Sequence, residues 1–492
     1  MLIGRAEEYS QLMDFYNSGR PELVVVYGRR RVGKTYLVRE TFSNQFFFSF
    51  TGTTTIKTKA GHLERFAQTL KAYGALPDKK KRIKSWNEAF DILTDFIKSV
   101  DGGERKVIFL DEVPWLDTPN SGFMGAFEFF WNNFASARKD VLFIICGSAA
   151  SWMSRKLFKN RGGLHNRTTG RILLAPLTLN ECEAYLDAKG SGYERYDIIE
   201  LYMVFGGIPF YLDLIDGRYS VPVNVDRALF AEGAPLANEF EELYASLFGT
   251  SQLYTDIVAA LGTKKKGLVR DEILESLGIE DGGAVTEVLN NLELSGFIRR
   301  YYAFPQKKRG SLYQLIDNFS LFWLSFMKEG RPTSPRYWSS QVNTPRINSW
   351  RGQAFESVCL NHVDQIEQGL GISGVLTKVS SWQSQRGKKS KNSIEAAEQS
   401  AVGYKGAQID LVIERADRII NICEVKYSQD ELEIDAALAE NLSNKMSAFK
   451  SETRTKKTVF LTMITTYGIK RNKHSGQIRA EVTMDALFLP TR

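Results

Sequence analysis

Cysteine is scarce in this chain, and long apolar runs are absent from it. The four cysteines lie far apart among 492 residues, at positions 146, 182, 359 and 423, and three of them have apolar neighbours. This distribution argues against a disulfide framework or a cysteine-rich zinc site and indicates buried thiols in a reducing compartment. No run of about 18 apolar residues occurs, so the sequence predicts no membrane span.

Charge of one sign is not in large excess either. The net charge is +7, which is compatible with a nucleic-acid partner but does not demand one. The first residues, "MLIGRAEEYSQL", carry acids where a signal peptide needs a basic and then an apolar stretch, so we expect a cytoplasmic protein. Apolar residues make up 43% of the chain, and its length favours about three domains, each able to bury a core.

The first motif joins a buried strand to a helix. Val24–Tyr27 is apolar, and it is followed by G-x-x-x-x-G-K-[ST] at residues 28–35 and by the helical pattern "YLVRETF". The glycines at 28 and 33 allow the main chain to wrap a phosphate with its N–H groups, and the helix N-terminus adds positive potential. In this pattern Lys34 reaches the β- and γ-phosphates, and the Thr35 hydroxyl ligates Mg²⁺.

We therefore predict that the nucleotide-binding residues of this loop are Gly28, Arg29, Arg30, Arg31, Val32, Gly33, Lys34, Thr35 and Tyr36. The three arginines are expected to face solvent or phosphate, without a catalytic role. The plainer alternative is a glycine turn that happens to precede a lysine, and the flanking strand and helix argue against it.

A second strand supplies acids. In "KVIFLDEVPWLD", Lys106–Leu110 predicts a buried parallel strand that ends at Asp111 and Glu112. Asp111 is expected to hold Mg²⁺ together with Thr35, and Glu112 to polarise the attacking water. An acidic pair after a strand is common at ordinary turns, so this assignment depends on the loop upstream.

Two further segments complete the expected site. The apolar strand "VLFIICG" ends at Ser148, whose hydroxyl is placed to sense a γ-phosphate, although a simple strand-ending turn explains it nearly as well. Arg167 and Arg171 flank a polar turn and are the candidates for a catalytic arginine finger; an ordinary surface role is the alternative. Strands alternating with helices predict an α/β fold, a P-loop NTPase parallel sheet with helices on both faces.

These segments, with "LIGRAEEYSQL" at the start and "LYMVFGGIPFYLDLI" later, resemble the archaeal-type branch of the STAND/AAA+ ATPases. The resemblance covers residues 1 to about 235. It implies that Ile3, Gly4, Arg5 and the turn at Gly207 and Pro209 pack near the adenine. From the residues alone, that turn is only a rigid connection between helices.

The middle segment changes pattern. "LYTDIVAALG", "VRDEILESLGI" and "GAVTEVLNNLELSGFI" predict three short helices, followed by two apolar runs around a basic turn, which is the pattern of a winged helix. The third helix carries Glu287 and Glu293, which would repel phosphate, so DNA contact and a structural lid over the nucleotide stay open as alternatives. Two lysine-containing stretches, 264–266 and 307–309, are expected backbone contacts if DNA binds.

The last segment predicts a second site. Helix "RGQAFESVCLNHVDQI" carries Glu356, a strand at 408–413 carries Asp410, and its hairpin partner at 418–425 ends in Glu424-Val-Lys426. Residues two apart on a strand share a face, so Glu424 and Lys426 are expected to point the same way, with Asp410 on the adjacent strand. Carboxylates suit Mg²⁺, and Lys426 suits a catalytic role beside a phosphodiester.

This order is similar to the PD-(D/E)xK nuclease fold, which often follows this branch of ATPases as a domain of undefined function. The resemblance implies a restriction-endonuclease-like α/β domain with Glu356, Asp410 and Glu424 as metal ligands. An ordinary amphipathic hairpin gives the same short string. The polar stretch from Trp382 to Gly406, with lysines at 388–391, is expected to be a loop, either touching nucleic acid or simply solvated.

The expected domains are a P-loop ATPase domain with a helical part at 1–235, a winged helix at 236–330, a linker at 331–348 and the nuclease-like domain at 349–492. The leading hypothesis is an ATPase that uses ATP and Mg²⁺ and controls a nuclease-like module acting on DNA. The alternatives are a nucleotide-dependent switch or assembly protein with an inert C-terminal domain, and a winged-helix transcription regulator. We expect ATP and DNA as partners, a homo-oligomer as one open possibility, and no membrane.

Overall fold

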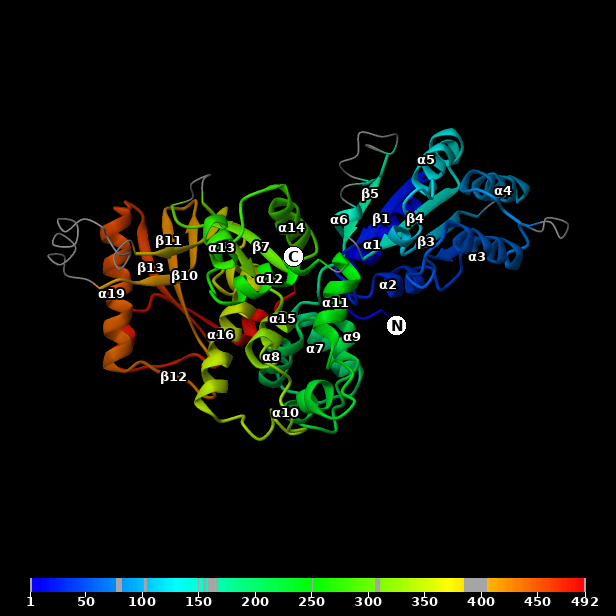
Figure 1. Cartoon of the computed structure of the whole chain (residues 1–492). Coiled ribbons are helices and arrows are strands. Elements are labelled where there is room, and N and C mark those ends of the chain that lie inside the picture. Colours follow the sequence, from blue (N-terminus) through cyan, green and yellow to red (C-terminus); the bar gives the residue numbers. More distant parts are fainter. Residues whose placement is uncertain are drawn as a thin grey trace.

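A computed structural model describes residues 2–490 except 77–81, 101–103, 149, 154–155, 158–163, 165–166, 250, 306–309 and 385–404. The expected basic turn at 307–309 and the lysines at 388–391 lie outside the described residues. The molecule is elongated, with a parallel sheet at one end, a mixed sheet at the other and helices between them (Figure 1). None of the helices in the described part of the chain is both long and apolar enough to cross a membrane.

The first sheet has five parallel strands in the order β2-β3-β4-β1-β5. Alternate residues of β1 explain why both of its faces are covered: Val24 and Val26 join one core cluster, and Leu23 and Val25 join the other. The strands are β1 (Glu22–Tyr27), β2 (Phe48–Thr51), β3 (Lys106–Asp111), β4 (Val141–Gly147) and β5 (Gly170–Leu173). The predicted α/β parallel sheet with helices on both faces is confirmed.

Two groups of helices cover this sheet. The first core cluster contains residues of α1 (Ala6–Asn17), α2 (Lys34–Thr41) and α7 (Leu179–Ala188). The second contains residues of α3 (Lys59–Ala72), α4 (Trp86–Ser99), α5 (Phe123–Asn133) and the short α6 (Ala150–Met153). Side-chain caps fix several starts; at α7 a reciprocal capping box joins Thr178 and Glu181.

Further helices connect the sheet to the middle of the molecule. They are α8 (Arg195–Phe205), α9 (Pro209–Leu212), α10 (Val221–Val225), a π-helical turn (Asp226–Phe230) and α11 (Glu239–Phe248). Their apolar residues continue the first core cluster, which runs on into the C-terminal part without interruption.

The middle segment has the three expected helices and a small antiparallel sheet in the order β6-β8-β7. Its elements are α12 (Gln252–Gly262), β6 (Leu268–Val269), α13 (Arg270–Leu277), α14 (Gly283–Leu294), β7 (Ile298–Tyr302), β8 (Ser311–Leu315) and α15 (Asn318–Phe326). Helix α14 packs against α6.

The expected linker at 331–348 is more ordered than its composition suggests. Trp338 is buried among aromatic rings that include Phe322 and Trp350, and the carboxylate of Asp226 accepts the main-chain N–H groups of residues 338 and 339. Helix α16 (Pro345–Asn361) begins inside the expected linker because a proline is tolerated in the first helical turn.

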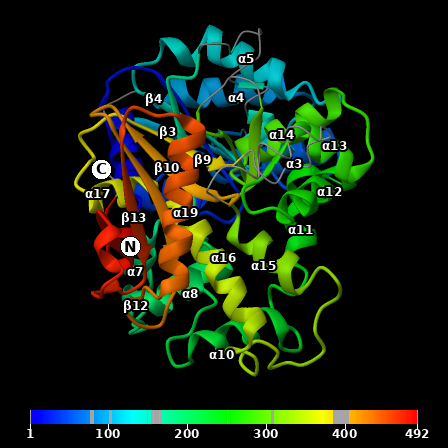
Figure 2. The same ribbon diagram turned by 90° about the vertical axis from the view of Figure 1, so that its left-hand side faces the viewer.

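The C-terminal sheet is mixed and has the order β15-β13-β11-β10-β9. Its hairpin β10–β11 is antiparallel, β11 and β13 are parallel, and helix α19 forms the crossover between them. Helix α19, which lies in front of the strands in Figure 2, covers one face of this sheet. Helix α16 packs on the other face. The remaining elements are α17 (Val363–Gly369), β9 (Thr377–Gln383), β10 (Gln408–Arg415), β11 (Ile419–Lys426), α19 (Ala436–Thr453), β13 (Thr458–Thr465), β15 (Ala480–Thr483), α20 (Met484–Leu487) and the pair β12 (Leu432–Glu433) and β14 (Ile469–Lys470).

Candidate functional site

The loop between β1 and α2 has a main-chain shape that its glycines permit. Gly28 has φ 144° and Gly33 has φ 90°, and a Cβ atom at Gly28 would lie 2.3 Å from the carbonyl oxygen of Leu174. Both positions therefore require glycine, for backbone conformation and, at Gly28, for space. The loop ends where α2 begins, so Lys34 occupies the first helical position.

Lys34 is held inside the loop by the main chain. Its Nζ atom donates hydrogen bonds to the carbonyl oxygens of Gly28 at 3.1 Å and Arg29 at 2.7 Å. The side chain is 6% exposed, and burial lowers the pKa of its ammonium group. An anionic ligand that took over these hydrogen bonds would stabilise the charged form of Lys34.

The side chains of Thr35 and Asp111 are in contact at the carboxyl ends of the parallel strands. The Thr35 hydroxyl donates to Oδ2 of Asp111 at 2.8 Å, and the main-chain N–H of Glu112 donates to Oδ1 at 2.9 Å. Asp111 ends β3, the second strand away from β1, with β4 between them. Burial raises the pKa of Asp111, although the Thr35 hydrogen bond opposes this effect. A hydroxyl and a desolvated carboxylate at this place match the oxygen ligands that Mg²⁺ prefers.

Glu112 follows in a left-handed conformation with φ 49°. Its carboxylate accepts the Ser148 hydroxyl at 2.7 Å and 2.9 Å, which orients the carboxylate at the end of β4. The sequence leaves Ser148 either as a γ-phosphate sensor or as part of a strand-ending turn; in the structure its hydroxyl donates to Glu112.

Of the residues described so far, Gly33, Lys34, Thr35 and Glu112 line a cavity of about 570 Å³. Three of the residues expected near an adenine, Ile3, Arg5 and Pro209, line it, and Gly4 lies between the first two. The Arg5 guanidinium donates to the carbonyl oxygen of Ala175 at 2.6 Å, and this fixes the N-terminal segment against the cavity wall. The lining also contains Leu2, Arg30, Arg31, Val32, Gly33, Lys34, Thr35, Tyr36, Leu37, Glu112, Leu177, Tyr185, Ala188, Lys189, Phe210 and Asp213.

The turn at Gly207 is a close packing point. The main-chain N–H of Leu177 donates to the Gly207 carbonyl at 2.6 Å, and a Cβ atom there would lie 1.8 Å from the Leu177 oxygen. This contact holds Pro209 and Phe210 beside the phosphate loop. Glycine is therefore required at position 207 for close packing, which the turn pattern alone did not reveal.

Two of the loop arginines depart from the expectation that all three face solvent or phosphate. Arg29 is 3% exposed, forms an ion pair with Asp317, and places its guanidinium 4.8 Å from the centre of the Phe297 ring. Arg31 borders the cavity but pairs with buried Glu239. The expectation was wrong for Arg29 and only partly right for Arg31, because carboxylates from distant parts of the chain pack against this loop. Arg30 lines the cavity as predicted.

The two arginine-finger candidates lie apart from this cavity. Arg171 sits opposite Val25 in the β1–β5 register, and its Nε atom donates to the Thr168 hydroxyl at 3.3 Å. Arg167 is exposed in a turn. Neither belongs to the described residues that line the cavity, so a role at the phosphates would require a second molecule or a movement of this segment.

The second candidate site has a different character. The predicted common face of Glu424 and Lys426 is confirmed by an ion pair of 2.9 Å, and Lys445 of α19 contacts the other Glu424 oxygen at 2.5 Å. Lys426 and Lys445 lower the pKa of Glu424 against the opposing effect of burial. Asp410 accepts a hydrogen bond from Gln408 at 2.6 Å.

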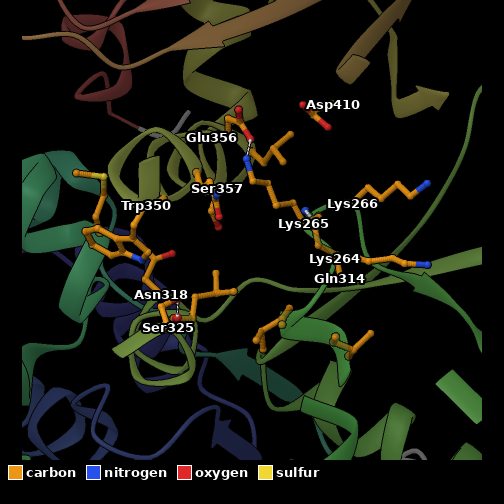
Figure 3. A pocket seen from close by; sticks show the side chains of 18 of the residues that line it. Lys264, Lys265, Lys266, Gln314, Asn318, Ser325, Trp350, Glu356, Ser357 and Asp410 are labelled. Carbon is orange, nitrogen blue, oxygen red and sulfur yellow. Dashed lines mark hydrogen bonds and ion pairs between the residues drawn. The ribbon is translucent and has the colours of Figure 1, made fainter. Parts of the chain in front are cut away.

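Glu356 projects from α16 toward Asp410, and Lys265 contacts it at 3.2 Å (Figure 3). Burial raises the pKa of Glu356, and the negative charge of Asp410 adds to the effect. Within the described residues, no group of three or more His, Cys, Asp or Glu side chains is close enough to hold a metal ion. Glu356, Asp410 and Glu424 therefore do not form a metal-binding set in this conformation, since lysines of the same chain already neutralise two of them.

Several residues at the first site were missed by sequence analysis. Asp317 and Glu239, and the cavity residues Tyr185, Lys189 and Asp213, belong to helices or helix ends far along the chain from the loop. Tyr185 donates to Asp213 at 2.8 Å, and this pair forms part of one wall. The only local signal was the aspartate–asparagine–x–serine string at 317–320, which is typical of a helix N-cap.

Comparison with known proteins agrees with this geometry. Residues 2–215 match a family described as an ATPase domain predominantly from Archaea. An uncharacterized protein of Methanocaldococcus jannaschii is 26% identical over 393 residues, covering 78% of this chain and 82% of the relative. An uncharacterized ATP-binding protein of the same organism is 40% identical over 45 residues, which are 9% of this chain and 76% of that protein.

Among solved structures, a Walker-type ATPase of Pyrococcus abyssi is similar, with 17% identity, a TM-score of 0.46, and coverage of 66% of this chain and 96% of that one. The family match spans the parallel sheet, the phosphate loop, the acidic pair and the turn at Gly207. Residues 2–215 of this chain therefore belong to the family of ATPase domains found predominantly in Archaea.

Proposed function

We propose that the chain binds ATP with Mg²⁺ in the cavity beside residues 28–36 and hydrolyses it, and that its nucleotide state controls the C-terminal part. The observation that carries this proposal is the meeting of Lys34, Thr35 and Asp111 at the carboxyl edge of one parallel sheet. This is the place where open α/β sheets bind ligands.

Each residue has a physical role in this proposal. The main-chain N–H groups of the loop and the start of α2 receive the phosphates, and Lys34 exchanges two carbonyl partners for phosphate oxygens. Thr35 and Asp111 would hold the Mg²⁺, which neutralises phosphate charge when it is bound. Glu112, oriented by Ser148, accepts a proton from the attacking water.

The test is ATP turnover by the purified chain and by Glu112→Gln. The substitution removes the proton acceptor but keeps the shape and the Ser148 contact, so turnover falls by about 10²–10⁴-fold while ATP affinity stays. Lys139→Ala is the control, because Lys139 is exposed and precedes β4 at the opposite edge of the sheet. Turnover in Glu112→Gln equal to that of the parent would contradict this assignment.

For the middle segment we propose a winged helix that acts as a structural lid. Three helices and a three-stranded antiparallel sheet support this reading, and so does the packing of α14 against α6, the short helix that follows β4. Its acidic residues disfavour a phosphate backbone. A specific footprint on promoter DNA would favour the transcription-regulator alternative instead.

For the C-terminal part we propose a PD-(D/E)xK-like fold. The antiparallel hairpin, the parallel crossover through α19 and the Glu424–Lys426 contact support it. The pairing of Glu356 and Glu424 with lysines favours a state without chemistry, as in the nucleotide-dependent switch. Plasmid nicking with Mn²⁺, tested against Asp410→Ala and Lys426→Ala, separates the two: nicking that both substitutions abolish indicates a nuclease acting on DNA, and no nicking indicates a switch.

A further inference from the structure

A short stretch of the chain lies between the two candidate sites. Residues 314–318, here called the bridging segment, run from the end of β8 into the start of α15. Gln314, Leu315 and Asn318 line a pocket of about 70 Å³ together with Glu356 and Asp410. Figure 3 shows this pocket, with Asn318 and Gln314 on one side and Glu356 and Asp410 on the other.

One end of the bridging segment contacts the phosphate loop. Oδ1 of Asp317 pairs with Arg29, and Oδ2 accepts the main-chain N–H of Ser320 at 2.9 Å and its hydroxyl at 2.6 Å. Asp317 therefore caps α15 and binds the loop with the same carboxylate. Both members of the ion pair are 3% exposed, so neither can move alone without leaving a buried charge unpaired.

This ion pair is next to the atoms that a nucleotide would disturb. The carbonyl oxygen of Arg29 accepts a hydrogen bond from Lys34 Nζ. When Lys34 turns to a phosphate, the main chain at Arg29 loses that bond. The Nε and Nη2 atoms of Arg29 have no hydrogen-bond partner among the described residues, so its buried guanidinium is only partly satisfied.

The other end of the bridging segment contacts the lysine loop between α12 and β6. The Gln314 side-chain amide donates to the carbonyl oxygen of Lys265 at 2.5 Å and accepts from Arg299 at 2.7 Å. Arg299 also donates to the Leu360 carbonyl of α16 at 2.7 Å. Lys265 in turn contacts Glu356 at 3.2 Å, and Figure 3 shows its side chain extended across the pocket toward that carboxylate.

We infer that the bridging segment couples the phosphate loop to the acidic pocket, so that ATP binding at Lys34 and release of Glu356 by Lys265 favour each other. The inference rests on the proposed ATP site and names how that site is regulated. In this proposal the described contacts define the closed state, in which Asp317 pairs with Arg29 of the phosphate loop and Lys265 pairs with Glu356.

Coupling of this kind is reciprocal, because each event shifts the same equilibrium. Weakening the closed conformation at the pocket therefore strengthens nucleotide binding at the loop. Nothing at the pocket needs to touch the nucleotide for this to happen.

The experiment measures the affinity of the full chain for a fluorescent ATP analogue with Mg²⁺. Lys265→Ala removes the contact with Glu356, and we expect it to tighten binding by about fivefold or more. Lys264→Ala is the matched control: it is the neighbouring residue of the same loop, pairs with Glu272 of α13, and is expected to leave the affinity unchanged.

A second substitution tests whether the coupling passes through the bridging segment. Gln314→Met keeps the side-chain volume but removes both hydrogen bonds of the amide, and in this background Lys265→Ala is expected to lose its effect. Equal affinities for Lys265→Ala and Lys264→Ala would overturn the coupling, and an undiminished effect beside Gln314→Met would overturn the route. No binding by any variant, the parent chain included, overturns the proposed ATP site instead.

Discussion

The two candidate sites both combine lysines with acidic residues, but these residues have different bonding partners at the two sites. At the first, Lys34 is bonded to neutral carbonyl groups, and Glu112 to a serine, beside a cavity of about 570 Å³. At the second, Glu356 and Glu424 are already paired with lysines, and the pocket measures about 70 Å³. At the first site the charged groups of Lys34 and Glu112 are bonded only to neutral groups, so a charged ligand can still pair with them. At the second site the carboxylates are already paired with lysines of the same chain. This difference favours the first site as the one that carries out a reaction.

The largest expected effect is a loss of stability when the buried Arg29–Asp317 ion pair is broken, compared with the half-exposed Lys265–Glu356 pair. Asp317→Ala leaves Arg29 charged in a buried place and removes the cap of α15, so we expect the free energy of unfolding to fall by about 3–5 kcal/mol. Lys265→Ala breaks a partly exposed pair and is expected to cost less than about 1 kcal/mol. Urea unfolding followed by circular dichroism measures both, and equal losses would remove the distinction between the two regions.

Next in size is the effect of the two motif lysines on ATP affinity. Lys34→Ala removes the cation that faces the phosphates, and ATP affinity is expected to fall by about 10²–10³-fold, within the range that truncating one partner of a buried charge pair costs. Lys426→Ala serves as the control at the second site and is expected to leave ATP affinity unchanged. A similar fall in ATP affinity in both variants would show that ATP binding does not depend specifically on the first site.

The third prediction concerns a histidine that connects α7 with α16. His362, at the break between α16 and α17, accepts the main-chain N–H of Leu179 at 3.2 Å and donates from Nδ1 to the Val358 carbonyl at 2.8 Å. Burial lowers the pKa of His362 to about 4. The folded chain therefore keeps this ring neutral, while the unfolded chain protonates it below its ordinary pKa of about 6.5.

The sign follows from the proton balance. As pH falls from about 6.5 to about 4, the unfolded state binds a proton that the folded state does not, so stability is lost, by up to about 3 kcal/mol. Urea midpoints measured over this range in the parent and in His362→Gln isolate the contribution. A parent chain whose midpoint falls no more steeply with acid than that of His362→Gln would count against it.

The smallest effect is expected from divalent ions without nucleotide. Because lysines hold Glu356 and Glu424, Mn²⁺ titration of the nucleotide-free chain is expected to show no tight site that depends on Asp410. Paramagnetic resonance of free Mn²⁺, compared between the parent and Asp410→Ala, measures this. A tight Mn²⁺ site in the parent that is lost in Asp410→Ala would show that the acidic pocket binds a divalent ion despite the lysines.

The first region was readable from the sequence because its determinants are local. Two glycines, a lysine and a threonine in fixed spacing follow a strand, and the strands predicted at 24–27, 106–110 and 141–147 all appear in the sheet with small changes in length. Register and parallel pairing then bring Thr35 to Asp111, 76 positions away, without further information.

The second region was only partly readable, for a physical reason. The hairpin and the common face of Glu424 and Lys426 follow from strand periodicity. Their charge state does not, because Lys445 and Lys265 reach Glu424 and Glu356 from positions 21 and 91 residues away. Arg29 and Asp317 are 288 positions apart, so no local pattern linked the phosphate loop to α15.

The most direct measurement is calorimetric titration of the folded full chain with ATP in the presence of Mg²⁺. We expect saturable binding of one nucleotide per chain, weakened by about 10²–10³-fold in Lys34→Ala and retained in Lys426→Ala. A folded chain that shows no binding of ATP with Mg²⁺, or binding that Lys34→Ala leaves intact, would contradict it.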